Sequence, residues 1–141
     1  MRQVAVFLYG LFMDAGALAR KGVRASDPRI ARLAGYRLCI GKRATLAPDP
    51  NDTVYGVLMQ VSADDLGRLY SEPSVMDYRP EPVRVVLGDG RMLDAICYNL
   101  PPSLEQAAPD PGYAPALYEL AASLGLPRCY LDRIARAGGA N

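Results

Sequence analysis

Histidine is absent from this 141-residue chain, and its absence restricts the chemistry that the other side chains can perform. Ser-His-Asp and Cys-His nucleophilic sites both need an imidazole base, and histidine is also the commonest metal ligand in proteins. The three cysteines, Cys39, Cys97 and Cys129, lie far apart and form no CxxC pair, so they indicate reduced core residues rather than disulfides or a zinc site. If the chain is an enzyme, a carboxylate, a tyrosine or a lysine must move its protons.

The segment Tyr9-Gly10-Leu11-Phe12-Met13 is the first candidate for a ligand site. It follows an apolar, β-favouring run at 3–8, which predicts a strand buried on both faces. A glycine directly after a strand lets backbone N–H groups turn toward a ligand with no side chain in the way. Any strand-to-helix turn can use a glycine in the same way, so on the residues alone a structural role is the simpler interpretation.

Glutamates are the first carboxylates to consider for proton transfer. Glu72 follows a predicted helix, and Glu81 stands beside a proline at the start of a predicted strand. Glu105 falls in a predicted loop and Glu119 on a helix face. Charges at such positions are usually solvated. The residues alone therefore favour a solvated Glu72.

Alternating strand and helix signals define the elements of the first half. Asp14 can cap a short helix that ends near Gly22. Asp27-Pro28 has the form of an N-cap followed by a first-turn proline, which predicts a second short helix before Gly35. Strands are predicted at 36–40 and 53–61, with the polar segment 48–52 as the turn of a long hairpin or meander.

The second half continues with a capping-box signal that predicts a helix at 63–70. Two β-favouring runs at 82–87 and 91–98 flank Gly88-Asp89-Gly90 and predict a hairpin. A proline-rich loop at 101–111 precedes a predicted helix at 113–124, which Gly125 caps. A last helix is predicted from Pro127 to about residue 137, and a frayed tail follows it. With no internal repeat and no domain boundary, we expect one domain over residues 1–141.

The composition is that of a globular protein, with 50% hydrophobic and 22% charged residues. Sixteen basic and fifteen acidic residues are scattered along the chain and give a net charge of +1, which argues against a nucleic-acid partner. No apolar run approaches the roughly 20 residues that span a bilayer. Since a basic leader with a cleavable apolar region is also missing, we expect a cytoplasmic protein with no membrane partner.

The opening VFLYGLFM resembles the V-F-x-Y-G-[ST]-[LN]-[LM] segment of γ-glutamylcyclotransferase-like (AIG2-like) proteins. Further matches follow in the family's order, namely ATLAP, VYGVLMQVSADDLGRLY, VRVVLGDGRMLDAICY and GYAPALYELAASLGLPRCYL. Each is weakly specific, but together they cover nearly the whole chain. The resemblance implies an α+β fold, a compact mixed β-barrel with helices packed around it and a ligand pocket bounded by the Tyr9-Gly10 loop.

The resemblance also implies an enzyme that releases 5-oxoproline from a small γ-glutamyl amide or amine. The substrate's α-amine attacks its own γ-carbonyl, closes a five-membered lactam and expels the other amine, so intramolecularity supplies much of the rate. The matching acid is Glu72, which would carry the proton from the α-ammonium to the leaving nitrogen. No metal or organic cofactor is required.

The same resemblance assigns the binding residues. Backbone N–H groups at 10–12 would bind the substrate carboxylate or the developing oxyanion, while two tyrosines shape the wall. The expected substrate-binding residues are Tyr9, Gly10, Leu11, Phe12 and Tyr78.

Three positions depart from the family pattern. Leu11 replaces a serine or threonine, Tyr70 the aspartate two residues before the acid, and Pro73 the glycine after it. Leu11 removes a hydroxyl that could contact a polar substrate, and Pro73 fixes the backbone beside the acid.

A second function therefore stays open, a non-catalytic module that binds a small amino-acid-like ligand in the same pocket. A third, a structural partner without a ligand, requires a pocket filled by side chains such as Phe12 or Met13. Neither the leaving amine nor the oligomeric state is indicated by any motif.

Overall fold

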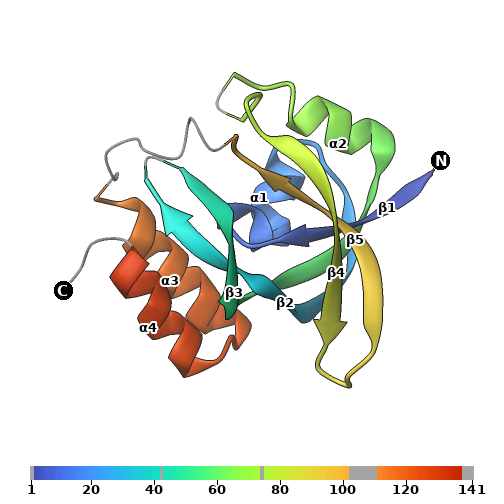
Figure 1. Ribbon diagram of the computed structural model, residues 1–141. Helices are drawn as coiled ribbons and strands as arrows, with labels where there is room; N and C mark the ends of the chain where they lie inside the picture. Colours follow the sequence, from blue (N-terminus) through green and yellow to red (C-terminus); the bar gives the residue numbers. More distant parts are fainter. Residues whose placement is uncertain (1, 42, 74, 102–110, 138–141) are drawn as a thin grey trace.

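The computed structural model describes residues 2–41, 43–73, 75–101 and 111–137. In this part of the chain, five strands close into a barrel in the order β1-β3-β2-β4-β5, with four α-helices around it (Figure 1). The strands are β1 (Gln3–Leu8), β2 (Ala25–Ile40), β3 (Ala44–Ser62), β4 (Arg79–Leu87) and β5 (Met92–Asn99). The helices are α1 (Ala15–Arg20), α2 (Ala63–Leu69), α3 (Tyr113–Leu124) and α4 (Arg128–Ala137), with a 3-10 turn η1 (Leu11–Met13). The α+β barrel with surrounding helices is confirmed.

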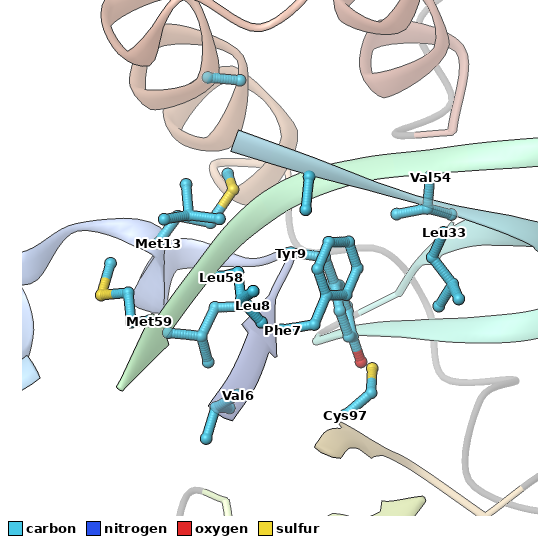
Figure 2. Packing of buried hydrophobic residues seen from close by; sticks show 14 of the residues in the cluster. Val6, Phe7, Leu8, Tyr9, Met13, Leu33, Val54, Leu58, Met59 and Cys97 are labelled. Atoms are coloured by element: carbon cyan, nitrogen blue, oxygen red, sulfur yellow. The ribbon is translucent and has the colours of Figure 1, made fainter. Parts of the chain in front are cut away.

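The first strand closes the barrel. β1 pairs antiparallel with β3 along its whole length and parallel with β5 at Val6 and Ile96. Val6, Phe7 and Leu8 are all buried, and because successive strand residues point to opposite faces, both faces of this half of β1 are covered. Figure 2 shows side chains from β1, β2, β3 and β5 converging in this core. The end of β1, where the Tyr9-Gly10 segment begins, is thereby held firmly.

The short helix predicted from Asp27-Pro28 is wrong, because this segment belongs to β2. Asp27 has a φ of 55°, which lies in the left-handed region and cannot continue a right-handed helix. The pairing with β3 shifts register just before Arg29. Beyond it, buried Ala31 and Leu33 alternate with exposed neighbours, a period of two that belongs to strands. The cap-like dipeptide therefore marks a β-bulge.

The turn predicted at 48–52 is also wrong. β2 and β3 form one long hairpin, as expected, but its turn falls between Ile40 and Ala44. Residues 49–52 are extra residues within β3, opposite Gly35, whose φ is 89°. The carboxylates of Asp49 and Asp52 accept hydrogen bonds from the backbone N–H groups of Asn51 and Thr53. The turn-forming residues at 48–52 therefore mark a second irregularity in the pairing of β2 with β3, and the hairpin does not end there.

The remaining local signals are confirmed. Asp14 caps α1 by accepting from the N–H of Gly16 at 2.9 Å, and Ser62 caps α2 through the N–H of Asp65 at 3.1 Å. Gly125 ends α3 with a φ of 86°. The β4–β5 hairpin turns at residues 88–90. Residues 102–110 of the predicted loop and the predicted frayed tail at 138–141 lie outside the described residues.

Helices α3 and α4 pack on each other, and α4 contacts β2 at one side of the barrel (Figure 1). Buried Leu117 of α3 and Ile134 of α4 join the same apolar cluster as the strands. Across the described ranges, no helix is both long enough and apolar enough to cross a membrane.

Candidate functional site

A cavity of about 290 Å³ lies where the end of β1 meets the segment after α2 and the start of α3. Its size is at the lower end of the range for small-molecule sites. Among the described residues, its lining consists of aromatic and aliphatic side chains and a single charged one. The lining residues are Phe7, Leu8, Tyr9, Gly10, Leu11, Phe12, Arg43, Ala44, Tyr70, Val75, Tyr78, Tyr98 and Tyr113.

Aromatic rings from four segments form one connected group in this wall. Tyr70, at the C-terminal cap of α2, stacks on Tyr98 of β5 with ring centroids 3.8 Å apart and planes inclined by 8°. Phe12 of η1 meets Tyr70 edge-on at 6.3 Å, and the ring of Tyr78 lies 6.1 Å from it. Such stacked and edge-to-face pairs add to the stabilisation from burial alone. Tyr70 therefore links the helix, the η1 turn and the barrel at the cavity.

Tyr9 anchors the glycine loop to β5. Its hydroxyl lies 2.8 Å from the backbone oxygen of Tyr98 and 2.9 Å from Asn99 Oδ1. Figure 2 shows the same hydroxyl beside the sulfur of Cys97, which is itself 3.6 Å from Asn99 Oδ1. Burial, with a further contribution from Cys97, raises the pKa of Tyr9 well above its usual value. The Tyr9 hydroxyl therefore hydrogen-bonds within the protein, to oxygen atoms of β5.

Gly10 is required by a close neighbour. A Cβ at this position would lie 2.8 Å from the hydroxyl oxygen of Tyr113, inside van der Waals contact. The backbone at Gly10 is extended, with φ −108° and ψ −153°, so the glycine is needed for space and not for an unusual dihedral. The loop and the start of α3 therefore fit together only because the side chain is missing.

Arg43 and Tyr78 contact each other in the cavity lining. The guanidinium carbon of Arg43 lies 5.7 Å from the centre of the Tyr78 ring, a cation–π contact, and one nitrogen is 3.3 Å from Asp77 Oδ2. The Tyr78 hydroxyl donates to the backbone oxygen of Ala44. These contacts join the segment after α2 to the start of β3.

The phenols of the cavity are hydrogen-bond donors and not bases. Burial raises the pKa of all five, because the phenolate form would lose its hydration. They are neutral at physiological pH. The five are Tyr9, Tyr70, Tyr78, Tyr98 and Tyr113.

Five of the six predicted site residues line the cavity, namely Tyr9, Gly10, Leu11, Phe12 and Tyr78. Glu72 does not, although Tyr70 and Val75 on either side of it in sequence do. Its carboxylate oxygens lie 3.0 and 3.2 Å from Lys21 Nζ. The two side chains are 36% and 38% exposed, and an ion pair so exposed contributes at most about 1 kcal/mol.

The other acids are less suitable for proton transfer. Glu81 and Glu119 are exposed, as expected, and Glu105 lies outside the described residues. None of the three cysteines forms a disulfide, but only Cys97 is a core residue as predicted, since Cys39 is half-buried and Cys129 is exposed.

Sequence reasoning missed four lining residues with polar side chains, Arg43, Tyr70, Tyr98 and Tyr113, as members of the site. Five of the nine tyrosines of the chain gather here, and they come from five segments with no shared spacing. One signal was available, because the sequence has Tyr70 where the family pattern has an aspartate, two residues before the acid. The sequence alone does not indicate that its ring faces the cavity.

Comparison with known proteins places this geometry in context. Residues 6–118 match the sequence profile of the gamma-glutamyl cyclotransferase, AIG2-like family. Among solved structures, a gamma-glutamyl cyclotransferase has a similar fold, with a TM-score of 0.79 and 21% identity over 94% of this chain and 86% of its own. Among curated proteins, none matches the chain.

Two further solved structures extend the comparison. YkqA from Bacillus subtilis has a TM-score of 0.79 and 26% identity over 99% of this chain and 55% of its own. A yeast gamma-glutamyl cyclotransferase specific to glutathione has a TM-score of 0.66 and 13% identity over 99% of this chain and 96% of its own. At identities of 21% and 13%, the two named cyclotransferases establish the shared fold alone.

Proposed function

Because the chain belongs to the gamma-glutamyl cyclotransferase, AIG2-like family, we propose that its tyrosine-lined cavity is a recognition site for a small amino-acid-like ligand. One observation carries this proposal. Among the described residues, the cavity wall contains five phenols and one guanidinium but no carboxylate. Cyclisation of a γ-glutamyl compound needs a base that removes a proton from the α-ammonium, and neutral phenols cannot be that base.

The wall offers matching contacts for such a ligand. Arg43 can bind a carboxylate, because a guanidinium presents several donors in one plane. The rings of Tyr70 and Tyr98 offer an aromatic surface for a flat amide or a hydrocarbon chain, and Leu11 and Val75 add apolar contact. The backbone N–H groups of the Gly10 loop are the remaining proposed donors. The volume of about 290 Å³ also argues against a purely structural role with a filled pocket.

Cyclotransferase activity is the second candidate, favoured by the family and by the position of Glu72 between two cavity residues. Glu72 would leave Lys21 and take a proton from the α-ammonium of a γ-glutamyl amide. The freed α-nitrogen would then bond to the γ-carbon, Glu72 would pass its proton to the leaving nitrogen as the bond from that carbon to it breaks, and the Glu72 carboxylate would take the second proton from the ring nitrogen. Because the Lys21 pair is weak and exposed, its loss is no barrier.

One pair of measurements tests both candidates. Binding of a panel of γ-glutamyl amides and free amino acids is followed by titration calorimetry, and release of 5-oxoproline from the same amides is followed by mass spectrometry. The recognition proposal expects binding without release, and affinity in Glu72→Gln within about twofold of the native protein, since removing an exposed ion pair is a small change. Glu81→Gln, which alters an exposed acid outside the cavity lining, is the matched control.

The outcomes are distinct. Release that disappears in Glu72→Gln but persists in Glu81→Gln would establish the cyclotransferase and overturn the recognition proposal. Absence of both binding and release, with the native circular dichroism spectrum retained, would contradict both candidates.

A further inference from the structure

A second cavity, of about 300 Å³, lies where helix α4 packs against the β2–β3 hairpin (Figure 1). It is about as large as the tyrosine-lined cavity, and the two share no described lining residue. Among its described lining residues, the charged ones are Arg37 from β2, Asp52 from β3, and Arg133 and Arg136 from α4. This arginine-lined cavity is therefore a separate and positively charged feature of the molecule.

One of the three arginines has a structural role. Arg133 pairs with Asp52 and donates to the backbone oxygen of Thr53 at 2.9 Å. Because Arg133 belongs to α4 and the other two residues to β3, these contacts fix the helix against the hairpin. Asp52 also accepts from the backbone N–H of Thr53 through the same oxygen, Oδ1. The packing of α4 thus accounts for one arginine and for the aspartate.

The other two arginines are not explained by this packing. Arg37 Nη1 lies 3.2 Å from Cys39 Sγ, and a thiol sulfur is a weak, uncharged acceptor. Arg136 is three residues from Arg133 and so lies on the same face of α4. Within the described ranges, neither Arg37 nor Arg136 forms an ion pair with a carboxylate. Two like charges therefore face one cavity without a described counter-charge, and like charges repel.

We propose that the arginine-lined cavity binds the phosphate group of a small molecule. A carboxylate has two oxygens in one plane and suits a single guanidinium, whereas a phosphate monoester has three terminal oxygens and nearly two negative charges. Its charge matches Arg37 and Arg136, and its oxygens point in several directions, as contact with two different elements requires. Leu38 and Ala137 offer apolar contact to the rest of the ligand. The proposal is independent of the tyrosine-lined cavity.

Calorimetric titration with small compounds tests the proposal, at low ionic strength so that screening is weak. The probes are glycerol 3-phosphate, inorganic phosphate, succinate and glycerol. We expect both phosphates to bind at least about fivefold more tightly than succinate, and glycerol not to bind. The tighter of the two phosphates shows whether the cavity takes an organic monoester or the free ion.

The charge of the phosphate gives a second readout. A phosphate monoester loses one of its two negative charges as the pH falls through about 6, so glycerol 3-phosphate should bind more weakly at pH 5 than at pH 7.5. Sulfate keeps both of its charges over this range and is the control. The chain has no histidine, so no imidazole titrates in this window. Equal pH dependence for the two anions would contradict recognition of the phosphate dianion.

Substitutions assign the contact to the two arginines. Arg37→Gln and Arg136→Gln should each weaken glycerol 3-phosphate binding at least about fivefold, and because both side chains are exposed, the fold should be retained. Arg128→Gln is the matched control, since it removes the same charge from the exposed start of α4, outside the described cavity lining. Its affinity should stay within about twofold of the native value.

Backbone amide shifts in a nuclear magnetic resonance titration locate the anion. Glycerol 3-phosphate should shift the amides of Leu38, Thr53 and Ala137 and leave those at 10–12 in place. No binding of either phosphate to the folded protein, equal losses in Arg128→Gln and Arg136→Gln, or shifts confined to 10–12 would each overturn the proposal. Succinate binding as tightly as the phosphates would overturn the assignment to a phosphate group. None of these outcomes alters the test of the recognition function.

Discussion

The rings of Tyr70 and Tyr98 lie face to face, with centroids 3.8 Å apart and planes inclined by 8°. Tyr70 caps α2 and Tyr98 lies in β5, so this contact fixes the end of the helix against the barrel. Phe12 of the glycine loop meets the same Tyr70 ring. The shape of the cavity therefore depends on a residue that replaces a polar family position.

Substitution of Tyr70 separates ring packing from its hydroxyl. Tyr70→Phe keeps the contacts with Tyr98 and Phe12, and its free energy of unfolding should stay within about 1 kcal/mol of the native value. Tyr70→Ala leaves a void in the aromatic group and should cost about 2–4 kcal/mol. Urea denaturation measures both. Equal stabilities for the two variants would contradict a structural role for the stack.

Gly10→Ala places a methyl group 2.8 Å from the Tyr113 hydroxyl oxygen and should cost about 1–3 kcal/mol through overpacking. Ligand affinity should fall as well, since the loop lines the cavity. Gly10→Ala with Tyr113→Phe removes the clashing hydroxyl and should recover most of the stability, in a double-mutant cycle followed by thermal denaturation. Gly88→Ala, where no atom lies within 4 Å of the new Cβ, is the control. Strict additivity would show that the two sites are independent.

Gly56→Ala tests how closely β3 and β1 approach. The new Cβ would lie 2.3 Å from the backbone oxygen of Leu8 and 3.0 Å from the Phe7 ring, and neither the paired strand nor the core can move easily. A loss of about 3 kcal/mol or more is expected. Gly67→Ala in α2 meets no atom within 4 Å and should instead stabilise the protein by about 0.5–1 kcal/mol. Similar changes for both variants in urea would refute the close approach.

Stability should decline at alkaline pH. Tyr9 and Tyr130 are 5% and 1% exposed, and burial raises the pKa of both above the ordinary value of 10.0. Above pH 10 the unfolded phenols lose protons that the folded ones keep, so each lowers the free energy of unfolding by about 1.4 kcal/mol per pH unit. Below pH 10, the contribution of both tyrosines to the free energy of unfolding is fully present. Burial also raises the pKa of Cys97 above 9.0, so the decline should begin near pH 9.

Urea denaturation between pH 7 and pH 11 measures this decline. Tyr9→Phe removes one of the titrating groups and should give a shallower slope above pH 10 than the native protein. An unchanged free energy of unfolding up to pH 11 would contradict the assigned burial.

Local chemistry explains which elements the sequence predicted. Asp14, Ser62 and Gly125 act on backbone groups within one helical turn, so their effect is readable from neighbouring residues. Asp27-Pro28 and the segment 48–52 carry the same kinds of signal but lie inside a ladder. There the partner strand supplies the hydrogen bonds, so the signals produce bulges and not a helix start or a turn.

By itself, the sequence determined the family, the barrel that the family implies and the glycine loop at the end of β1, because those rest on ordered motifs and on periodicity. The tertiary structure decided the chemistry of the cavity. It pairs Glu72 with Lys21, which is 51 residues away, and it turns Tyr70 onto Tyr98 and brings Arg43 into the wall. The reason is physical: the direction of each of these side chains depends on neighbours that only closure of the barrel brings within reach.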